Sequence, residues 1–143
     1  RGGQGSFDAA RAVLAQWWRQ RMGGADAPVV DNGAGLSREA RLSPRALARM
    51  LQQAWASPVM PEFVASLPVA GVDGTLRRRP ALPAGAAHLK TGSLRDVAAM
   101  AGYVLAASGR RYVLVAIVNH PDAAAARPAL DALVDWAARD TGL

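Results

Sequence analysis

The sequence of 143 residues suits a single domain, since a chain of this length buries about 68–70% of the surface that its unfolded form exposes. Its 17 basic and 11 acidic residues give a net charge of +6, a moderate excess without the clustering of a dedicated nucleic-acid binder, so no nucleic-acid partner is predicted. The absence of cysteine excludes disulfides and thiolate metal sites, and the uncharged run at 97–109 is too short for a membrane span, so none is predicted.

The first predicted element is a helix that begins after Ser6, a good N-cap, and ends at Gly23-Gly24. Apolar residues recur along it at helical spacing: Phe7, Ala10, Val13, Leu14 and Trp17. The stretch "DNGAG" that follows has the glycines and short polar side chains of turns. Because it lacks the third glycine of a dinucleotide-binding fingerprint, a tight structural turn is the favoured interpretation.

A second helix is predicted from Ser43-Pro44, a cap followed by proline in the first turn. One apolar stripe supports it: Leu47, Met50, Leu51, Ala54 and Trp55. Pro58 and Pro61 end this pattern and predict a short helical turn around Phe63 and Val64. Prolines and glycines then predict a long ordered loop over residues 67–85.

From residue 86 onward the sequence consists of short apolar runs rich in Val, Tyr and Ile, which predict three strands in an antiparallel meander. The first strand is predicted over residues 86–92, with His88 and Lys90 on one side and Leu89 and Thr91 on the other. A closing helix within residues 123–140 has one apolar face, formed by Leu130, Leu133, Val134 and Ala137. Helices, loop, strands and helix in this order predict an α+β fold.

Neither a metal site nor a cofactor is predicted. The only histidines, His88 and His120, lie on different predicted elements and have no metal-ligand spacing. The run Arg77 to Arg79 has no interleaved aromatic residues for base stacking, and a solvated charge run is its favoured interpretation. With Arg110-Arg111 it supports an alternative function, a stand-alone basic module that binds an anionic polymer.

Lys90 is the only lysine in a chain that otherwise uses arginine as its cation. A lysine is a compact, titratable ammonium, whereas arginine keeps its proton, so the difference matters most where protons move. Thr91, Gly92 and Ser93 follow directly. A phosphate-binding loop does not fit, because Leu89 instead of glycine precedes the lysine.

A lysine, threonine and glycine on a strand, followed by a hairpin strand and a C-terminal helix, form one of the three motifs of penicillin-binding proteins and serine β-lactamases. Further segments extend the match over about residues 30 to 120: "DNGAGLSRE", "SLPVAGVDGTLRRR" and "KTGSLRDVAAMAGYVLAASGRRYVLVAIVN". Together they resemble the C-terminal part of the D-alanyl-D-alanine carboxypeptidase/endopeptidase family of the DacB type (penicillin-binding protein 4). The fold expected is therefore the C-terminal portion of a DD-peptidase/β-lactamase-like transpeptidase fold.

The resemblance implies a role for each residue of the strand. Lys90 would place positive charge in the cleft and join the proton transfers, and Thr91 would bind the substrate carboxylate. Gly92 would let an extended substrate lie against the strand as an added antiparallel partner. The backbone N–H of Ser93 would form half of the oxyanion hole. The partners implied are a peptidoglycan peptide and β-lactams, and the location implied is the periplasm.

The other two family motifs are absent. A Ser-x-x-Lys motif that ends at Lys90 would need serine at position 87, which is Ala87. Val30 and Ile117 stand where Ser-x-Asn would need serine before the two asparagines. Residues 1–143 are therefore expected to be one C-terminal fragment of the penicillin-binding domain, inactive alone because the nucleophile lies upstream.

A third interpretation of the chain is a purely structural lobe that docks on a catalytic partner chain. The fragment interpretation carries one further expectation. The strand over residues 112–118 would lose its neighbour on one side, and a long apolar edge is a template for pairing with another chain. Self-association through residues 112–118 is therefore expected.

Overall fold

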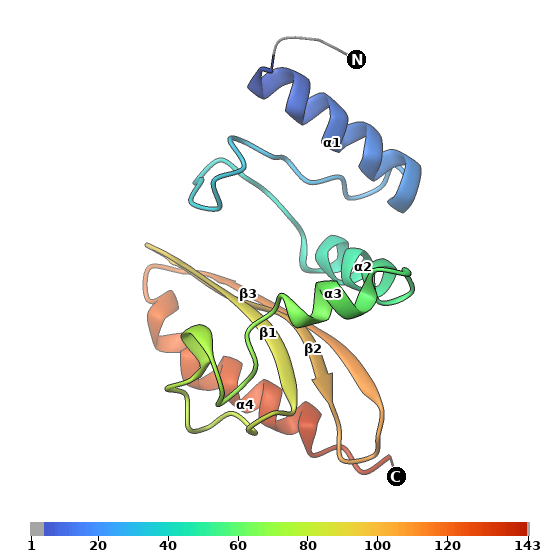
Figure 1. Cartoon of the computed structure of the whole chain (residues 1–143). Helices are drawn as coiled ribbons and strands as arrows, with labels where there is room; N and C mark the ends of the chain where they lie inside the picture. Colours follow the sequence, from blue (N-terminus) through green and yellow to red (C-terminus); the bar gives the residue numbers. More distant parts are fainter. Residues whose placement is uncertain (1–4, 143) are drawn as a thin grey trace. The chain divides into compact units, whose positions relative to one another are not determined.

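The computed structural model describes residues 5–142 and has the α+β composition predicted from the sequence (Figure 1). The chain falls into two compact units, one up to residue 50 and one from residue 51 onward. In order, the elements are α1 (Phe7–Met22), α2 (Pro44–Trp55), α3 (Met60–Ala65), the 3-10 turn η1 (Gly74–Leu76), β1 (Ala87–Leu94), β2 (Val97–Leu105), β3 (Arg111–Asn119), the 3-10 turn η2 (Ala123–Ala126) and α4 (Arg127–Ala138).

In the first unit, α1 begins and ends where the sequence predicts. The Ser6 hydroxyl accepts a hydrogen bond from the Ala9 N–H at 3.1 Å, and Gly23 terminates the helix with φ 75°. The buried face differs from the predicted stripe, because Trp18 and Met22 are buried with Ala46 of α2. The helix was thus predicted correctly, while the stripe on which it was predicted stays exposed: Phe7, Val13, Leu14 and Trp17 are 42% to 65% exposed.

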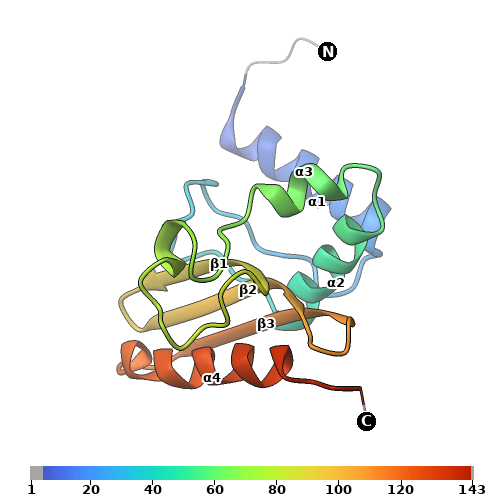
Figure 2. The ribbon, with the colours of Figure 1, turned by 60° about the horizontal axis from the view of Figure 1, so that its bottom comes forward.

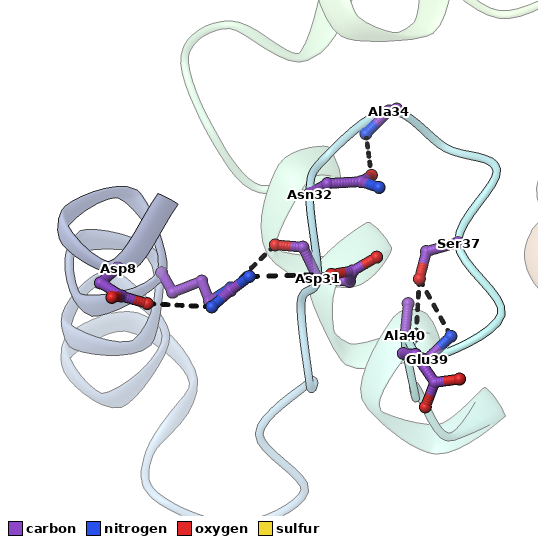
Figure 3. A network of polar contacts seen from close by, with 8 residues as sticks. Asp8, Asp31, Asn32, Ala34, Ser37, Glu39 and Ala40 are labelled. Carbon is purple, nitrogen blue, oxygen red and sulfur yellow. Dashed lines mark hydrogen bonds and ion pairs between the residues drawn. The ribbon is translucent and has the colours of Figure 1, made fainter. Parts of the chain in front are cut away.

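Polar contacts hold the loop after α1, and Figure 3 shows them. The Arg11 side chain lies 3.0 Å from the Asp8 carboxylate and 3.7 Å from that of Asp31. The Asn32 side-chain oxygen accepts a hydrogen bond from the Ala34 N–H at 2.9 Å, which closes a short turn. This contact confirms the turn predicted for "DNGAG".

The second unit is built on a three-stranded antiparallel sheet in the order β1-β2-β3. Helix α4 covers one face of the sheet (Figure 2), and its Val134 is fully buried. The long loop before β1 is ordered as predicted because it buries Leu76 and Leu82 in the same core. The other core residues come mainly from the sheet and α4: Ala70, Ala87, Leu89, Ala98, Met100, Val104, Leu114, Ala123, Leu130 and Ala137.

Three details differ from the predicted elements. β1 runs two residues further than expected, to Leu94, and a two-residue turn leads into β2. The end of this turn is Asp96, whose φ of 64° lies in the left-handed region. The last helix begins as a 3-10 turn, and Leu133 on its predicted apolar face is 38% exposed.

The opposite face of the sheet carries Tyr103, which packs against two rings from the helical segment of the same unit. The Trp55 ring centroid lies 5.2 Å from that of Tyr103, and the Phe63 centroid lies 6.4 Å away. The Tyr103 hydroxyl donates a hydrogen bond to the Leu51 carbonyl at 2.7 Å, and burial raises the pKa of this phenol. None of the helices within residues 5–142 is long and apolar enough to cross a membrane.

Candidate active-site strand

β1 lies at one edge of the sheet, and only the first part of that edge is covered. The Ala70 N–H donates to the Ala87 carbonyl at 2.9 Å, and the Leu89 N–H donates to the Pro68 carbonyl at 2.9 Å. The loop before β1 thus pairs briefly with the start of the strand. These two bonds also show that residues 87 and 89 direct their backbone groups away from β2.

The backbone groups of Thr91 and Ser93 point outward for the same reason. In an antiparallel ladder, every second residue bonds to the neighbouring strand and the residues between turn their N–H and C=O to the other side. Thr91 and Ser93 continue the series of residues 87 and 89 along β1, which pairs with β2 without interruption to Leu94. The edge therefore offers backbone donors and acceptors to an extended chain at the residues that the sequence singled out.

Lys90 lies in a strand, as predicted, and its side chain is exposed while Leu89 is fully buried. This difference is the alternation expected for successive residues of a strand. The Lys90 ammonium donates a hydrogen bond to the Thr91 carbonyl at 2.8 Å. The one lysine of the chain is therefore held beside the open edge, with its charge on the face opposite α4.

The Thr91 side chain is tied to the loop before β1. Its hydroxyl lies 2.8 Å from the hydroxyl of Thr75 in η1, and either group can donate this hydrogen bond. The contact joins the strand to the "DGTL" segment, which the sequence connected to it only through a resemblance. Each threonine oxygen keeps a further lone pair for a ligand.

Gly92 contrasts with Gly102, the glycine of β2 that pairs with Leu89. A Cβ on Gly92 would lie 3.5 Å from the Ala99 Cβ, which is ordinary contact, so the described fold leaves room for a side chain there. A Cβ on Gly102 would overlap the His88 carbonyl oxygen, and the Gly102 φ is 153°. The fold therefore requires glycine at position 102 but not at position 92.

Ser93 lines a hollow together with arginines that the sequence did not connect to the strand. The hollow lies between the loop before β1, the strand and the start of α4; its main polar residues are Thr75, Arg78, Arg79, Thr91, Ser93 and Arg127. The interpretation of Arg77 to Arg79 as a solvated run is therefore wrong in part. Arg79 is paired with Asp131 at 2.6 Å, with only 17% and 13% of the two side chains exposed, and Arg78 faces the hollow.

The two histidines do not gather metal ligands. His120 uses its Nδ1 to accept a hydrogen bond from the Asp122 N–H at 3.0 Å in the turn after β3. The buried Nδ1 of His88 has no hydrogen-bond partner among the residues that the structure describes. Over the same residues, no group of three or more His, Asp or Glu side chains could hold a metal ion.

Comparison with known proteins identifies the family of the chain. The model of the D-Ala-D-Ala carboxypeptidase 3 (S13) family matches residues 1–140. The chain belongs to this family. The S13 family is the one that the Lys-Thr-Gly strand and its flanking segments predicted, so the resemblance stated from the sequence is confirmed.

Two curated relatives support the assignment to the S13 family. A D-alanyl-D-alanine carboxypeptidase from Actinomadura sp. (strain R39) is 36% identical over 99 residues, and the match covers 64% of this chain and 18% of that protein. The D-alanyl-D-alanine carboxypeptidase DacB of Haemophilus influenzae is 30% identical over 95 residues, covering 64% of this chain and 20% of the relative. The chain thus spans about a fifth of the length of the curated relatives that it matches.

A solved structure supports the fold. The crystal structure of penicillin-binding protein 4 (dacB) from Haemophilus influenzae, complexed with a novel β-lactam, matches with a TM-score of 0.69 and 28% identity. The match covers 80% of this chain and 27% of that chain. The predicted α+β fold of the DD-peptidase type, with helices packed on an antiparallel meander, is therefore confirmed for this S13 chain.

Proposed function

We propose that this chain is the C-terminal part of a serine-type D-Ala-D-Ala carboxypeptidase or endopeptidase that cleaves peptidoglycan peptides through an acyl-enzyme and binds β-lactams. The observation that carries the proposal is the edge of β1, which holds Lys90, Thr91, Gly92 and Ser93. At this edge the backbone groups of Thr91 and Ser93 point away from β2, and the Lys90 ammonium lies beside them. Membership of the S13 family supports the reaction class. Because relatives of this kind act on cell-wall peptides, the periplasm is the proposed location.

The geometry of the strand supports a separate role for each of its residues. An extended substrate pairs with the outward backbone groups of Thr91 and Ser93, as an added antiparallel strand. Gly92 lets that chain approach closely, because no Cβ stands between them. The Ser93 N–H donates to the oxygen of the attacked carbonyl, where one such donor typically contributes about 10²–10³ in rate.

Lys90 supplies a movable proton carrier beside this edge. An ammonium on a flexible stem can transfer a proton and can also stabilise negative charge, whereas a guanidinium can do only the second. Its hydrogen bond to the Thr91 carbonyl keeps it within reach of the substrate strand. The nucleophile belongs to a part of the protein outside these 143 residues, because the chain has no Ser-x-x-Lys.

Labelling with a fluorescent penicillin tests the proposal. The full-length protein should form a covalent adduct, and Lys90→Ala should abolish it, because the lysine takes part in the proton transfers. The 143-residue chain alone should form none, since covalent catalysis needs the missing nucleophile. A stoichiometric adduct on the isolated chain, detected by intact mass, would show that the nucleophile has been placed wrongly.

A matched control variant distinguishes a specific role of Lys90 from a general effect of positive charge. Arg49→Gln removes an exposed cation from α2 and should leave labelling of the full-length protein unchanged. Equal losses from Lys90→Ala and Arg49→Gln would contradict the assignment of the cleft to β1. A full-length protein that neither binds penicillin nor releases D-alanine would overturn the proposed function as a whole.

A further inference from the structure

The hollow beside Ser93 holds more positive charge than the described residues neutralise. Its only lining carboxylate belongs to Asp131, which is already engaged: the Arg79 Nη2 lies 2.6 Å from its Oδ1, and the Arg79 Nε donates to its Oδ2 at 3.2 Å. Arg79 is therefore neutralised by this pair. The two remaining cations of the hollow are Arg78 and Arg127.

Arg78 and Arg127 carry their charge unpaired. Both are exposed, and neither guanidinium makes an ion pair or hydrogen bond with another residue that the structure describes. The Arg127 carbonyl, in contrast, accepts a hydrogen bond from the Arg79 Nη2 at 3.4 Å, which fixes the backbone at the start of α4. Arg78 and Arg127 thus line one small hollow without a counter-charge from the residues that the structure describes.

Neutral donors lie on the same side of β1. The Thr91 and Ser93 side chains are two residues apart on the strand, so they project from the same face of the sheet. When the Thr75 hydroxyl donates in its hydrogen bond with Thr91, the Thr91 hydroxyl keeps its own proton for a ligand. Hydroxyl donors next to unpaired guanidinium groups form the combination that binds a carboxylate, which accepts several hydrogen bonds in one plane.

We infer that Arg78, assisted by Arg127, is a specificity-determining residue that holds the terminal carboxylate of the substrate against Thr91 and Ser93. The inference rests on the proposed function, because a DD-peptidase substrate pairs with β1 and ends in a carboxylate one residue beyond the attacked bond. It gives a reason for the position of Arg78 and Arg127, which line the hollow beside the strand without an ion-pair partner among the described residues. It also gives two arginines of the "LRRR" segment different roles: Arg79 shapes the hollow through its pair with Asp131, and Arg78 faces the ligand.

Kinetics of the full-length protein on two peptides test this inference. The peptides are N-acetylated and end in D-Ala-D-Ala, one with a free carboxylate and one with a carboxamide. Arg78→Gln should lower kcat/KM for the carboxylate peptide by roughly 10- to 100-fold, the usual value of a charge-assisted hydrogen bond, and should change the carboxamide peptide by less than about threefold. Arg127→Gln should act in the same direction, and Arg49→Gln should change neither peptide.

Two results in this experiment would overturn the inference: equal losses on both peptides, which indicate a structural role, or no loss on either. If the wild-type protein cleaves neither peptide, the proposed function fails, and binding decides the inference separately. In an amide chemical-shift titration of this chain, N-acetyl-D-Ala-D-Ala should shift the resonances of Thr91 and Ser93 more than its carboxamide does. That preference should disappear in Arg78→Gln; a preference that persists, or shifts equal for both peptides, would reject the inference.

Discussion

Arg79 of the loop before β1 and Asp131 of α4 form the most buried ion pair among residues 5–142, with the Nη2 and Oδ1 atoms 2.6 Å apart. Only 17% of the arginine side chain and 13% of the aspartate side chain are exposed, so solvent screens the pair less than it screens the other ion pairs of the described chain. The pair joins the segment that carries Thr75 to the helix that covers the sheet. It thereby holds one wall of the hollow beside Ser93.

Removing one partner of this pair should destabilise the second unit. We expect Asp131→Ala to lower the free energy of unfolding by about 1–3 kcal/mol, because Arg79 then keeps a partly buried charge without its partner. Asp135→Ala, which breaks the exposed pair with Arg139, should cost less than about 1 kcal/mol. Chemical denaturation of both variants measures the difference, and equal losses would show that burial does not strengthen the Arg79 pair.

The two glycines of the sheet should respond in opposite ways to an added methyl group. Gly102→Ala should destabilise the fold by about 3 kcal/mol or more, because its Cβ meets the His88 carbonyl oxygen and its φ is unfavourable for alanine. Gly92→Ala should leave the melting temperature nearly unchanged but reduce penicillin labelling of the full-length protein. Thermal melts combined with labelling check both effects; full labelling of a folded Gly92→Ala protein would contradict the close approach of a substrate to β1.

Asp140 should make stability depend on pH at the acid end. The Tyr112 hydroxyl donates to its carboxylate at 2.7 Å and, with the Gly142 N–H and the Ser108 hydroxyl, holds the pKa of Asp140 below its ordinary value of 3.8. A carboxyl whose folded pKa is lowered stabilises the protein above its unfolded pKa, and the contribution disappears as the pH falls through the folded pKa.

Melting temperatures measured against pH test this sign. Asp140→Asn should melt below the wild-type chain at neutral pH, and the difference should shrink as the pH falls below about 4. Asp122→Asn is the control, since that carboxylate is exposed and forms no ion pair with another described residue. A difference that stays constant down to the lowest pH would mean that Asp140 acts through shape and not through its charge.

The outer edge of β3 should mediate self-association of the isolated chain. Within the described part of the second unit, β3 pairs on one side only, with β2. The Ala106 N–H bonds to the Arg110 carbonyl at 2.9 Å, so the even-numbered residues of β3 bond inward and Val113, Val115 and Ile117 turn their backbone groups outward. We propose that a second copy pairs with this apolar edge.

A proline substitution at the edge tests the pairing. Val115→Pro removes an outward N–H and should yield a folded monomer in sedimentation velocity, whereas the wild-type chain associates with increasing concentration. Ala116→Pro removes an inward N–H and should instead unfold the sheet. A wild-type chain that remains monomeric at high concentration, with fast amide exchange at residues 113, 115 and 117, would exclude this interface.

Local sequence was sufficient for the elements and for the strand of the candidate site. The boundaries of α1 follow from Ser6 and Gly23, because capping depends on a few consecutive residues. The strand around Lys90 follows from the alternation of apolar and polar side chains, and Leu89 is buried as that alternation requires. The family could be recognised for the same reason: each segment that carries the resemblance is a continuous stretch of the chain.

What the tertiary structure decided is which distant residues meet. Nothing in the local pattern of "LRRR" distinguishes its three arginines, because the loop around them has no periodicity that fixes a direction for their side chains. Only the packing of this loop between β1 and α4 pairs Arg79 with Asp131 and places Arg78 and Ser93 in the lining of one hollow. Likewise, alternation predicts the faces of β1, but the register with β2 decides that Ser93 directs its N–H outward, since hydrogen-bond direction depends on the neighbouring strand.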